Sequence, residues 1–296
     1  MTLYQRTVFA QLVVDGYPVN ITQYPQQFSF QNPAATLAKN EWESSITSKK
    51  NTGFWKNNQT YFAQGAFRIN SNNKSGFHGL GLTAYYDKEG AYLKRYRGYL
   101  LYAYHLKLNK TYSISGGLAF GMMSYQAGNS DYDGGTANGL DGNLGFMFYS
   151  KSFFLSANIA QLPQSRLQPI NEITSLTRYY QILIGKDFSL NDNLLLRSNV
   201  NTKLYSTISP DIYGQIGLQW KEAVGLYGIY KYENQASVMI GLEKIELDGF
   251  QLRSYISYDV PINGDSRYQA FEITLQCVKP EKINSKSKNA KKKRRK

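Results

Sequence analysis

Apolar and polar positions alternate along most of this chain with a period of two residues. Residues 111–123, TYSISGGLAFGMM, show this clearly, because one set of alternate positions is mostly large and apolar and the other is small. The large set is Tyr112, Ile114, Gly116, Leu118, Phe120 and Met122, and the small set is Ser113, Ser115, Gly117, Ala119 and Gly121. Alternate side chains of a strand point to opposite faces. The segment therefore predicts a strand whose apolar face lies against lipid and whose small residues line a crowded interior.

Alternating segments of about ten residues recur through the chain, and few stretches of helical period compete with them. We recognise fourteen, at residues 42–49, 59–70, 77–87, 95–108, 111–123, 139–149, 152–160, 177–188, 193–205, 210–220, 223–231, 236–245, 248–258 and 268–278. About ten residues is the length that a tilted strand needs to cross a bilayer. The pattern predicts an all-β fold, a transmembrane outer-membrane antiparallel β-barrel of about 14 strands.

The connections between these segments are alternately short and long. The short ones, NSNNKSG, LNKT, SKS, LND, KEA and ELDG, are rich in the residues that turn geometry favours. Most of the others are longer, at 124–138, 161–176 and 259–267, with exceptions near 206–209 and 231–235. Outer-membrane barrels have short periplasmic turns and longer extracellular loops. We therefore expect the cell outer membrane as the location, with both termini on the periplasmic side.

The face opposite the apolar one is polar in several segments. In residues 193–205 it carries Arg197, Asn199, Asn201 and Lys203, which cannot lie against lipid and which we expect to face the lumen. Residues 177–188 are less regular, because Lys186 shares a face with two isoleucines. This indicates a bulge or a different register.

Three regions of different character divide the chain. Residues 1–40 show no clear strand and hold three of the eight prolines, and we expect them to form a lumen plug or a periplasmic lid. Residues 41–278 are the predicted barrel. From Lys279 onward ten Lys or Arg stand against one Glu, so of the net charge of +13 only +4 belongs to the body. Residues 279–296 are predicted to be a disordered periplasmic tail that anionic lipid or an acidic partner, rather than nucleic acid, would attract.

Composition agrees with a barrel but does not require one. The chain has 296 residues, a negative mean hydropathy and no run of eighteen apolar residues, which excludes a membrane-spanning helix. Its 25 tyrosines suit an interfacial girdle, although a soluble β-sandwich adhesin also accepts many. The apolar stretch in the first residues, MTLYQRTVFAQ, is too short for a full signal peptide. The sequence therefore leaves open whether a leader was removed.

Residues that carry catalytic chemistry are scarce. His78 and His105 are the only histidines, and we interpret both as satisfied or lumen-facing strand residues. Cys277, the single cysteine, is read as a small apolar residue, so no disulfide within the chain is possible. DYDGG at residues 131–135 lacks the ligands of a calcium loop, and no hydrolase or phosphate-binding motif is present. We expect no enzyme activity, no metal and no cofactor; an outer-membrane enzyme stays a minor alternative.

The most specific stretch is QYPQQFSFQNPAATLA, at residues 23–38. Its glutamines, followed by Phe28, Ser29, Asn32, Pro33 and Ala34, resemble the opening of the PorP/SprF family of the Bacteroidetes type IX secretion system. The resemblance extends over most of residues 11–278, including GFHGLGLTAYYDKEG, RGYLLYAYHLKLNKTYSISGGLAFGMMSY, FSLNDNLLLRSNVNTKL and QAFEITLQCV. The chain departs from the family in having Ala35, Thr36 and Leu37 where Tyr-Ala-Gly is common, and in its long basic tail.

The resemblance implies a non-enzymatic outer-membrane barrel. Such a barrel would bind, help to export or anchor a large secreted surface protein, such as a gliding-motility adhesin, through its C-terminal signal domain, together with other type IX secretion components. Because Tyr and Arg are frequent in interface hot spots, we expect loop contacts at Tyr125, Tyr132, Arg166 and Tyr268.

The alternative is a passive porin or small-molecule channel. In a channel, basic residues of the lumen would tune selectivity. Four such residues are Arg68, Lys107, Arg197 and Lys203.

Overall fold

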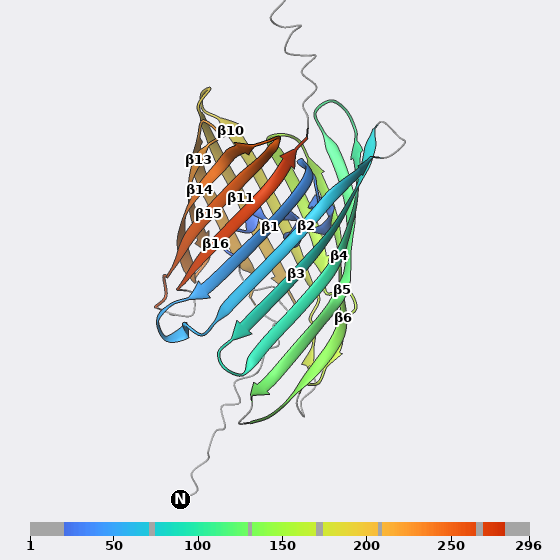
Figure 1. The fold of residues 1–296 in the computed structure, drawn as a ribbon, viewed down its shortest axis with the longest axis vertical. Coiled ribbons are helices and arrows are strands. Elements are labelled where there is room, and N and C mark those ends of the chain that lie inside the picture. The colour runs from blue at the N-terminus through green and yellow to red at the C-terminus, as the bar shows by residue number, and fades with distance from the viewer. Residues whose placement is uncertain are drawn as a thin grey trace, which may run out of the picture.

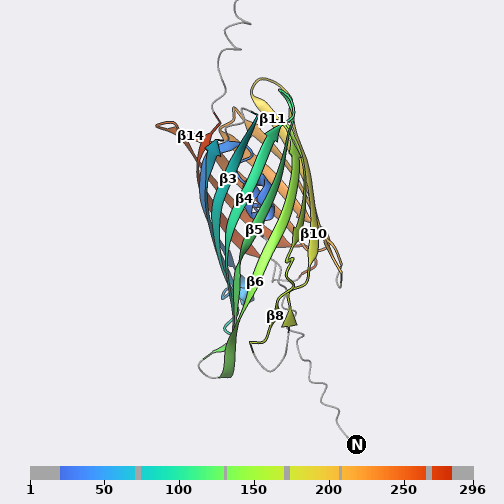
Figure 2. The same ribbon diagram turned by 90° about the vertical axis from the view of Figure 1, so that its right-hand side faces the viewer.

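The chain forms a closed antiparallel β-barrel of fourteen strands, as the sequence predicts (Figures 1 and 2). The structure, a computed structural model, describes residues 21–70, 75–129, 132–169, 174–206, 209–264 and 269–281. Each strand pairs with the next, and β1 closes the barrel by pairing with β16, from Asn40 opposite Pro280 to Asn51 opposite Ala270. None of the described helices is long and apolar enough to cross a membrane.

The barrel strands match the fourteen predicted segments one by one. They are β1 (Asn40–Asn51), β2 (Gln59–Asn70), β3 (Gly76–Glu89), β4 (Leu93–Lys107), β5 (Ser113–Asn129), β6 (Tyr132–Tyr149), β7 (Phe153–Ala160), β10 (Tyr179–Ser189), β11 (Leu194–Tyr205), β12 (Asp211–Trp220), β13 (Val224–Lys231), β14 (Gln235–Leu247), β15 (Phe250–Pro261) and β16 (Ala270–Pro280). Two short strands, β8 (Arg166–Leu167) and β9 (Thr174–Ser175), pair with each other in a separate sheet, and a 3-10 helix, η3 (Gly53–Trp55), follows β1.

The two ends of the barrel differ. The turn end carries the short connections 71–75, 108–112, 150–152, 190–193, 221–223 and 248–249, and β1 begins and β16 ends there, at the top of Figure 1. The loop end, at the bottom, carries 52–58, 90–92, 130–131, 161–178, 206–210, 232–234 and 262–269. The expected loop at 124–138 is wrong, because β5 and β6 continue through most of it as a paired hairpin. That hairpin raises one side of the wall at the loop end (Figure 2).

An apolar belt surrounds the outer wall. On β5 the predicted lipid-facing residues Leu118, Phe120 and Met122 are 52%, 60% and 57% exposed. The irregularity suspected at Lys186 is neither a bulge nor a slipped register, because β10 pairs regularly with both neighbours. Lys186 faces outward with its ammonium over the Phe188 ring, which lets a cation remain on the lipid side near the turn end.

Residues 21–39 lie inside the barrel and fill the middle of its lumen (Figure 1). They contain η1 (Tyr24–Gln26), α1 (Phe28–Gln31) and η2 (Pro33–Ala35), and we call this segment the plug. The described chain starts beside strand ends of the loop end, since Thr22 bonds to Asp259 of β15, and it crosses the lumen to begin β1 at the turn end. We expected both termini on the same side of the barrel. The start of β1 and the end of β16 do lie together at the turn end, but the described chain begins at Ile21, near the loop end.

Candidate functional site

The plug is fixed to the wall at Asn32. Its amide nitrogen donates to the Ser156 hydroxyl at 2.6 Å and to the backbone oxygens of Phe146 at 3.1 Å and Ala157 at 2.9 Å. Its oxygen accepts from the Ala34 N–H at 2.8 Å and so caps η2. A Cβ at Gly145 of β6 would overlap that oxygen, so the wall leaves room there for the plug.

The small inward-facing residues of β5 provide a second contact site for the plug. Ser115 donates its hydroxyl to the Ala34 oxygen at 2.6 Å, and a Cβ at Gly117 would overlap the Ala34 nitrogen. His105 lies 2.7 Å through Nε2 from the Thr36 oxygen and 2.8 Å through Nδ1 from the Tyr149 hydroxyl. The inward face of β5 is therefore small because the plug backbone packs directly against it.

Buried charges anchor the start of the plug. The backbone N–H groups of Thr22 and Gln23 donate to the Glu272 carboxylate at 2.8 and 3.0 Å. Lys49 pairs with Asp259 at 2.7 Å and approaches Glu272 at 3.7 Å. Because both carboxylates have fully buried side chains, each charge is stabilised only while these partners stay in place.

The remaining family-signature residues also belong to the plug. Ser29 donates to Glu43 at 2.5 Å, and the Phe28 ring packs edge-on against Phe154 at 4.6 Å. Pro33 starts η2 at a position where its missing N–H costs nothing. The sequence singled these residues out as a family signature without assigning them contacts; their role in the structure is to hold the plug in the lumen.

The four residues expected to face the lumen lie on the inner face of β11, where they contact plug or wall. Arg197 donates to Glu243 at 3.0 Å, and Asn199 accepts from the Tyr24 hydroxyl of the plug at 2.6 Å. Asn201 accepts from Gln181 at 2.9 Å. Lys203 is buried with its ammonium 5.8 Å from the centre of the Tyr213 ring.

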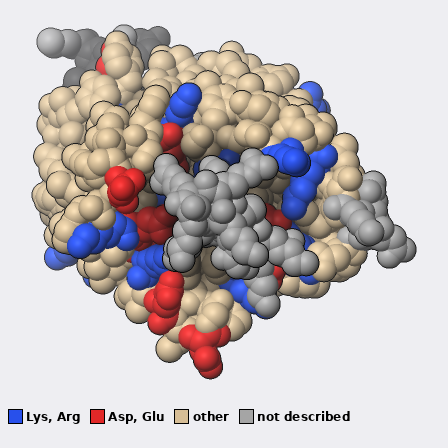
Figure 3. Space-filling view, turned by 90° about the horizontal axis from the view of Figure 1, so that it is seen from above, with Lys and Arg blue, Asp and Glu red and all other residues tan. Residues whose placement is uncertain are grey.

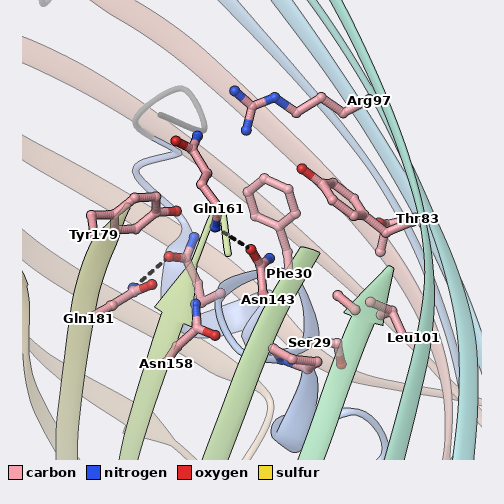
Figure 4. A pocket seen from close by; sticks show the side chains of 14 residues that line it. Ser29, Phe30, Thr83, Arg97, Leu101, Asn143, Asn158, Gln161, Tyr179 and Gln181 are labelled. Carbon is pink, nitrogen blue, oxygen red and sulfur yellow. Dashed lines mark hydrogen bonds between the residues drawn. The ribbon is translucent and has the colours of Figure 1, made fainter. Parts of the chain in front are cut away.

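Two small cavities flank the plug. One, of about 20 Å³, lies between Phe30 and polar side chains that include Arg97 and Gln181, and it is large enough for about one water molecule (Figure 4). The other, of about 150 Å³, lies toward the turn end and is lined by Lys39, Arg197 and other residues.

Charged side chains of both signs gather around the mouth at the turn end (Figure 3). Two contacts there hold Glu281, the residue that follows β16. Glu281 accepts from Lys107 at 2.9 Å and from Arg68 at 3.3 Å. Partial burial acts to raise the pKa of Glu281, but these two cations outweigh it and hold the pKa below its ordinary 4.5. Arg68 and Lys107, the expected channel-tuning residues, are thus engaged with the segment after β16.

Of the four predicted loop contacts, the structure describes the side chains of two, Tyr125 and Arg166. Tyr125 is wrong as a loop contact, because it lies in β5 and is fully buried. Arg166 is exposed in β8. Tyr132 opens β6 but its side chain lies outside the described residues, as does all of Tyr268.

Tyr125 is buried because described residues of the connection after β7 pack under the raised hairpin. Leu167 and Leu176 of that connection pack with Met123, Tyr125 and Ala127 on the inner face of β5. The length of the connection between β7 and β10 indicated that it has some structure of its own. It did not indicate that the connection would cover the inner face of β5.

Other candidate chemistry has structural partners. His78 lies 2.9 Å from the Tyr102 hydroxyl, and His105 contacts the plug. Within the described ranges no group of three His, Cys, Asp or Glu residues is arranged to hold a metal ion. Part of DYDGG opens β6, and Asp131 lies outside the described residues.

Solved structures share this fold at low sequence identity. The Ralstonia pickettii toluene transporter TbuX is 12% identical with a TM-score of 0.53, over 85% of this chain and 92% of the transporter. A Pseudomonas aeruginosa FadL homologue is 9% identical with a TM-score of 0.55, over 85% and 93%. At such identities the likeness shows an outer-membrane barrel fold and no more. Comparison with curated protein sequences gives no match.

The plug signature and the barrel are matched together by one family. Residues 13–277 match the type IX secretion system membrane protein PorP/SprF family, which spans the plug and nearly all of the barrel. This agrees with the resemblance of residues 23–38 and with an outer-membrane location. The chain belongs to the PorP/SprF family of type IX secretion system membrane proteins.

Proposed function

We propose that this barrel binds a large secreted surface protein, such as an adhesin, through the C-terminal signal domain of that protein and helps to export or anchor it. The observation that carries the proposal is the filled lumen. A barrel whose interior is occupied by residues 21–39, hydrogen-bonded to the wall on several sides, is suited to act through its surface. Family membership supports a secreted protein and other type IX components as its partners.

The loop end is the proposed binding side. Short turns mark the periplasmic end of outer-membrane barrels, so the opposite end faces outward. That end has the raised hairpin of β5 and β6, with the exposed Arg166 on the connection packed beneath it. Arg166 remains a proposed contact, and Tyr132 and Tyr268 are proposed from sequence alone.

A channel is the second candidate. Its support is that the structurally similar TbuX is described as a toluene transporter and that a cavity of about 150 Å³ remains beside the plug. Conductance in planar bilayers separates the two readings. We expect the intact chain to be silent, and a stable open channel would favour the second candidate.

The proposal is tested by purifying the tagged chain from native outer membranes in mild detergent and identifying what accompanies it by mass spectrometry. We expect a secreted protein represented mainly by its C-terminal domain. The matched control is an unrelated tagged barrel from the same membranes. Recovery of the same companions with both barrels, or of none, would refute the proposal.

The basic end of the chain is proposed to touch anionic head groups or an acidic partner in the periplasm. Residues 279–281 are described, and the rest lies outside the described residues. Deleting residues 286–296 should reduce partner recovery or correct localisation. Unchanged recovery and localisation would refute this role.

A further inference from the structure

Strand β6 is much longer than the partner on one of its sides. It spans 18 residues and pairs with β5 over almost its whole length, but with β7 only from Leu144 to Tyr149. Within the described residues, the part of β6 nearest the loop end, around Thr136 and Asn138, therefore has no paired strand on the side away from β5, which we call its free edge. Figure 2 shows the hairpin of β5 and β6 extending beyond the rest of the wall at the loop end, at the bottom of the view.

The alternation of backbone groups shows which residues face that edge. In an antiparallel strand the N–H and C=O of one residue point to the same side, and successive residues alternate. The Gly142 oxygen accepts from the Leu162 N–H, and the Leu140 oxygen accepts from the Ser165 hydroxyl, both on the side away from β5. By the same alternation Asn138 and Thr136 point their N–H and C=O groups to the free edge.

No hydrogen bond within the described part of the chain reaches these groups of Thr136 and Asn138 from the edge side. The described residues of the connection after β7 cover the edge at Gly142 and Leu140, and beyond them they pack against the inner face of β6. Contacts at Gly135 with Pro169, and at Gly139 with Leu167 and Ser165, mark that inner face.

The free edge lies in water rather than in lipid. Outward side chains of β6 are apolar from Phe146 to Leu140, which are 50% exposed each, and then change to Asn138 and Thr136. The neighbouring β5 changes in the same way after Met122. A polar strand edge above an apolar belt is placed to meet a protein at the cell surface.

The edge also lacks the features that usually prevent strand pairing. Natural edges carry lysine, proline, a bulge or a covering segment. Residues 134–140, GGTANGL, contain neither lysine nor proline, and their register with β5 is regular from Gly135. A row of alternating donors and acceptors two residues apart is complementary to an extended peptide backbone, which neither a lipid nor a small molecule offers.

We infer that the edge of β6 at Thr136 and Asn138 is a docking site for an extended segment of a protein partner, which adds as a strand to the barrel wall. The inference rests on the proposed function for the identity of that partner, the secreted surface protein. Pairing through the backbone supplies affinity, and the outward side chains of Thr136 and Asn138 contribute selectivity.

The test compares two double variants. Thr136→Pro with Asn138→Pro removes two edge-facing donors and leaves the residues that bond to β5 intact, and proline is tolerated on edge strands. Thr136→Ala with Asn138→Ala keeps the donors. After native purification we expect the proline variant to lose the secreted protein about thirtyfold, from two lost hydrogen bonds, and the alanine variant to retain it within about twofold.

A second measurement does not depend on the proline variant folding. A photo-reactive benzoylphenylalanine is placed at position 138, and at position 109 on the turn end as the matched control. We expect an adduct from position 138 to one short segment of the secreted protein, with slowed amide exchange at residues 136 and 138 in the complex.

Equal recovery with a folded proline variant would overturn the inference, as would adducts from position 138 to lipid, to a second copy of this chain or to no protein. A wild-type preparation without any secreted protein would instead refute the proposed function. In that case only the cross-linking experiment tests the docking site, and the absence of a protein adduct at position 138 would refute it.

Discussion

Asn32 links the plug to two wall strands at once, and its truncation should loosen the plug while leaving the barrel folded. Its side chain takes part in four hydrogen bonds, to Phe146, Ser156, Ala157 and Ala34. Asn32 belongs to the plug, so Asn32→Ala removes these contacts and leaves every residue of the barrel wall unchanged.

The size of the effect follows from those bonds. A typical intramolecular hydrogen bond contributes about 0.5–1.5 kcal/mol net. Three of the four bonds join the plug to the wall, so the expected loss of plug docking free energy is about 2–4 kcal/mol; the fourth, from the Ala34 N–H, lies within the plug. Since 1.4 kcal/mol is a factor of ten, the open fraction should rise between about thirtyfold and a thousandfold.

Amide hydrogen exchange of the purified barrel in detergent measures that fraction. Exchange in residues 28–36 should accelerate by the same factor, while exchange in the strands stays unchanged. The matched control is Asn109→Ala, which removes an equivalent side chain from a turn far from the plug, where it accepts from Thr111 and Tyr112. The shift of the folded band on heating in gel electrophoresis reports whether the barrel itself remains intact.

The reasoning would be refuted if Asn32→Ala exchanged at residues 28–36 no faster than wild type or Asn109→Ala. It would also be refuted if strand exchange rose together with plug exchange, since the plug would then be part of the folding unit of the barrel.

Three further predictions concern other contacts of the plug and of the turn end. Gly117→Val places a side chain where the plug backbone now packs, so conductance in planar bilayers should change from silent to open, whereas Gly116→Val, which faces outward, should stay silent. Lys49→Met leaves Asp259 buried without its cation and should cost about 3–5 kcal/mol, measured by chemical unfolding; a loss under 1 kcal/mol would contradict the buried pair. The pKa of Glu281 is depressed, so its contribution is present above pH 4.5 and lost as pH falls below that value; exchange at residues 278–281 should rise on acidification in wild type but not in Glu281→Gln.

The sequence alone determined the type of fold. Period-two alternation in fourteen segments was enough for the barrel, because the pleat of a strand ties side-chain polarity directly to the face it occupies. The same pattern placed Asn199, Asn201 and Lys203 opposite the lipid side. The small set at Ser115, Gly117 and Ala119 also indicated an occupied interior, and residues 1–40 were the available candidate for occupying it.

The tertiary structure decided what these residues contact. Sequence separations of 114 and 125 residues divide Asn32 from Phe146 and Ala157, and no local pattern specifies which glycine of β6 will face a plug side chain. Tyr125 was misassigned because residues 124–138 were read as a long loop, whereas pairing with β6 extends strand β5 past it. The free edge of β6 depends on where β7 stops pairing, and β-pairing over a distance is set by the closed barrel rather than by the residues of the edge itself.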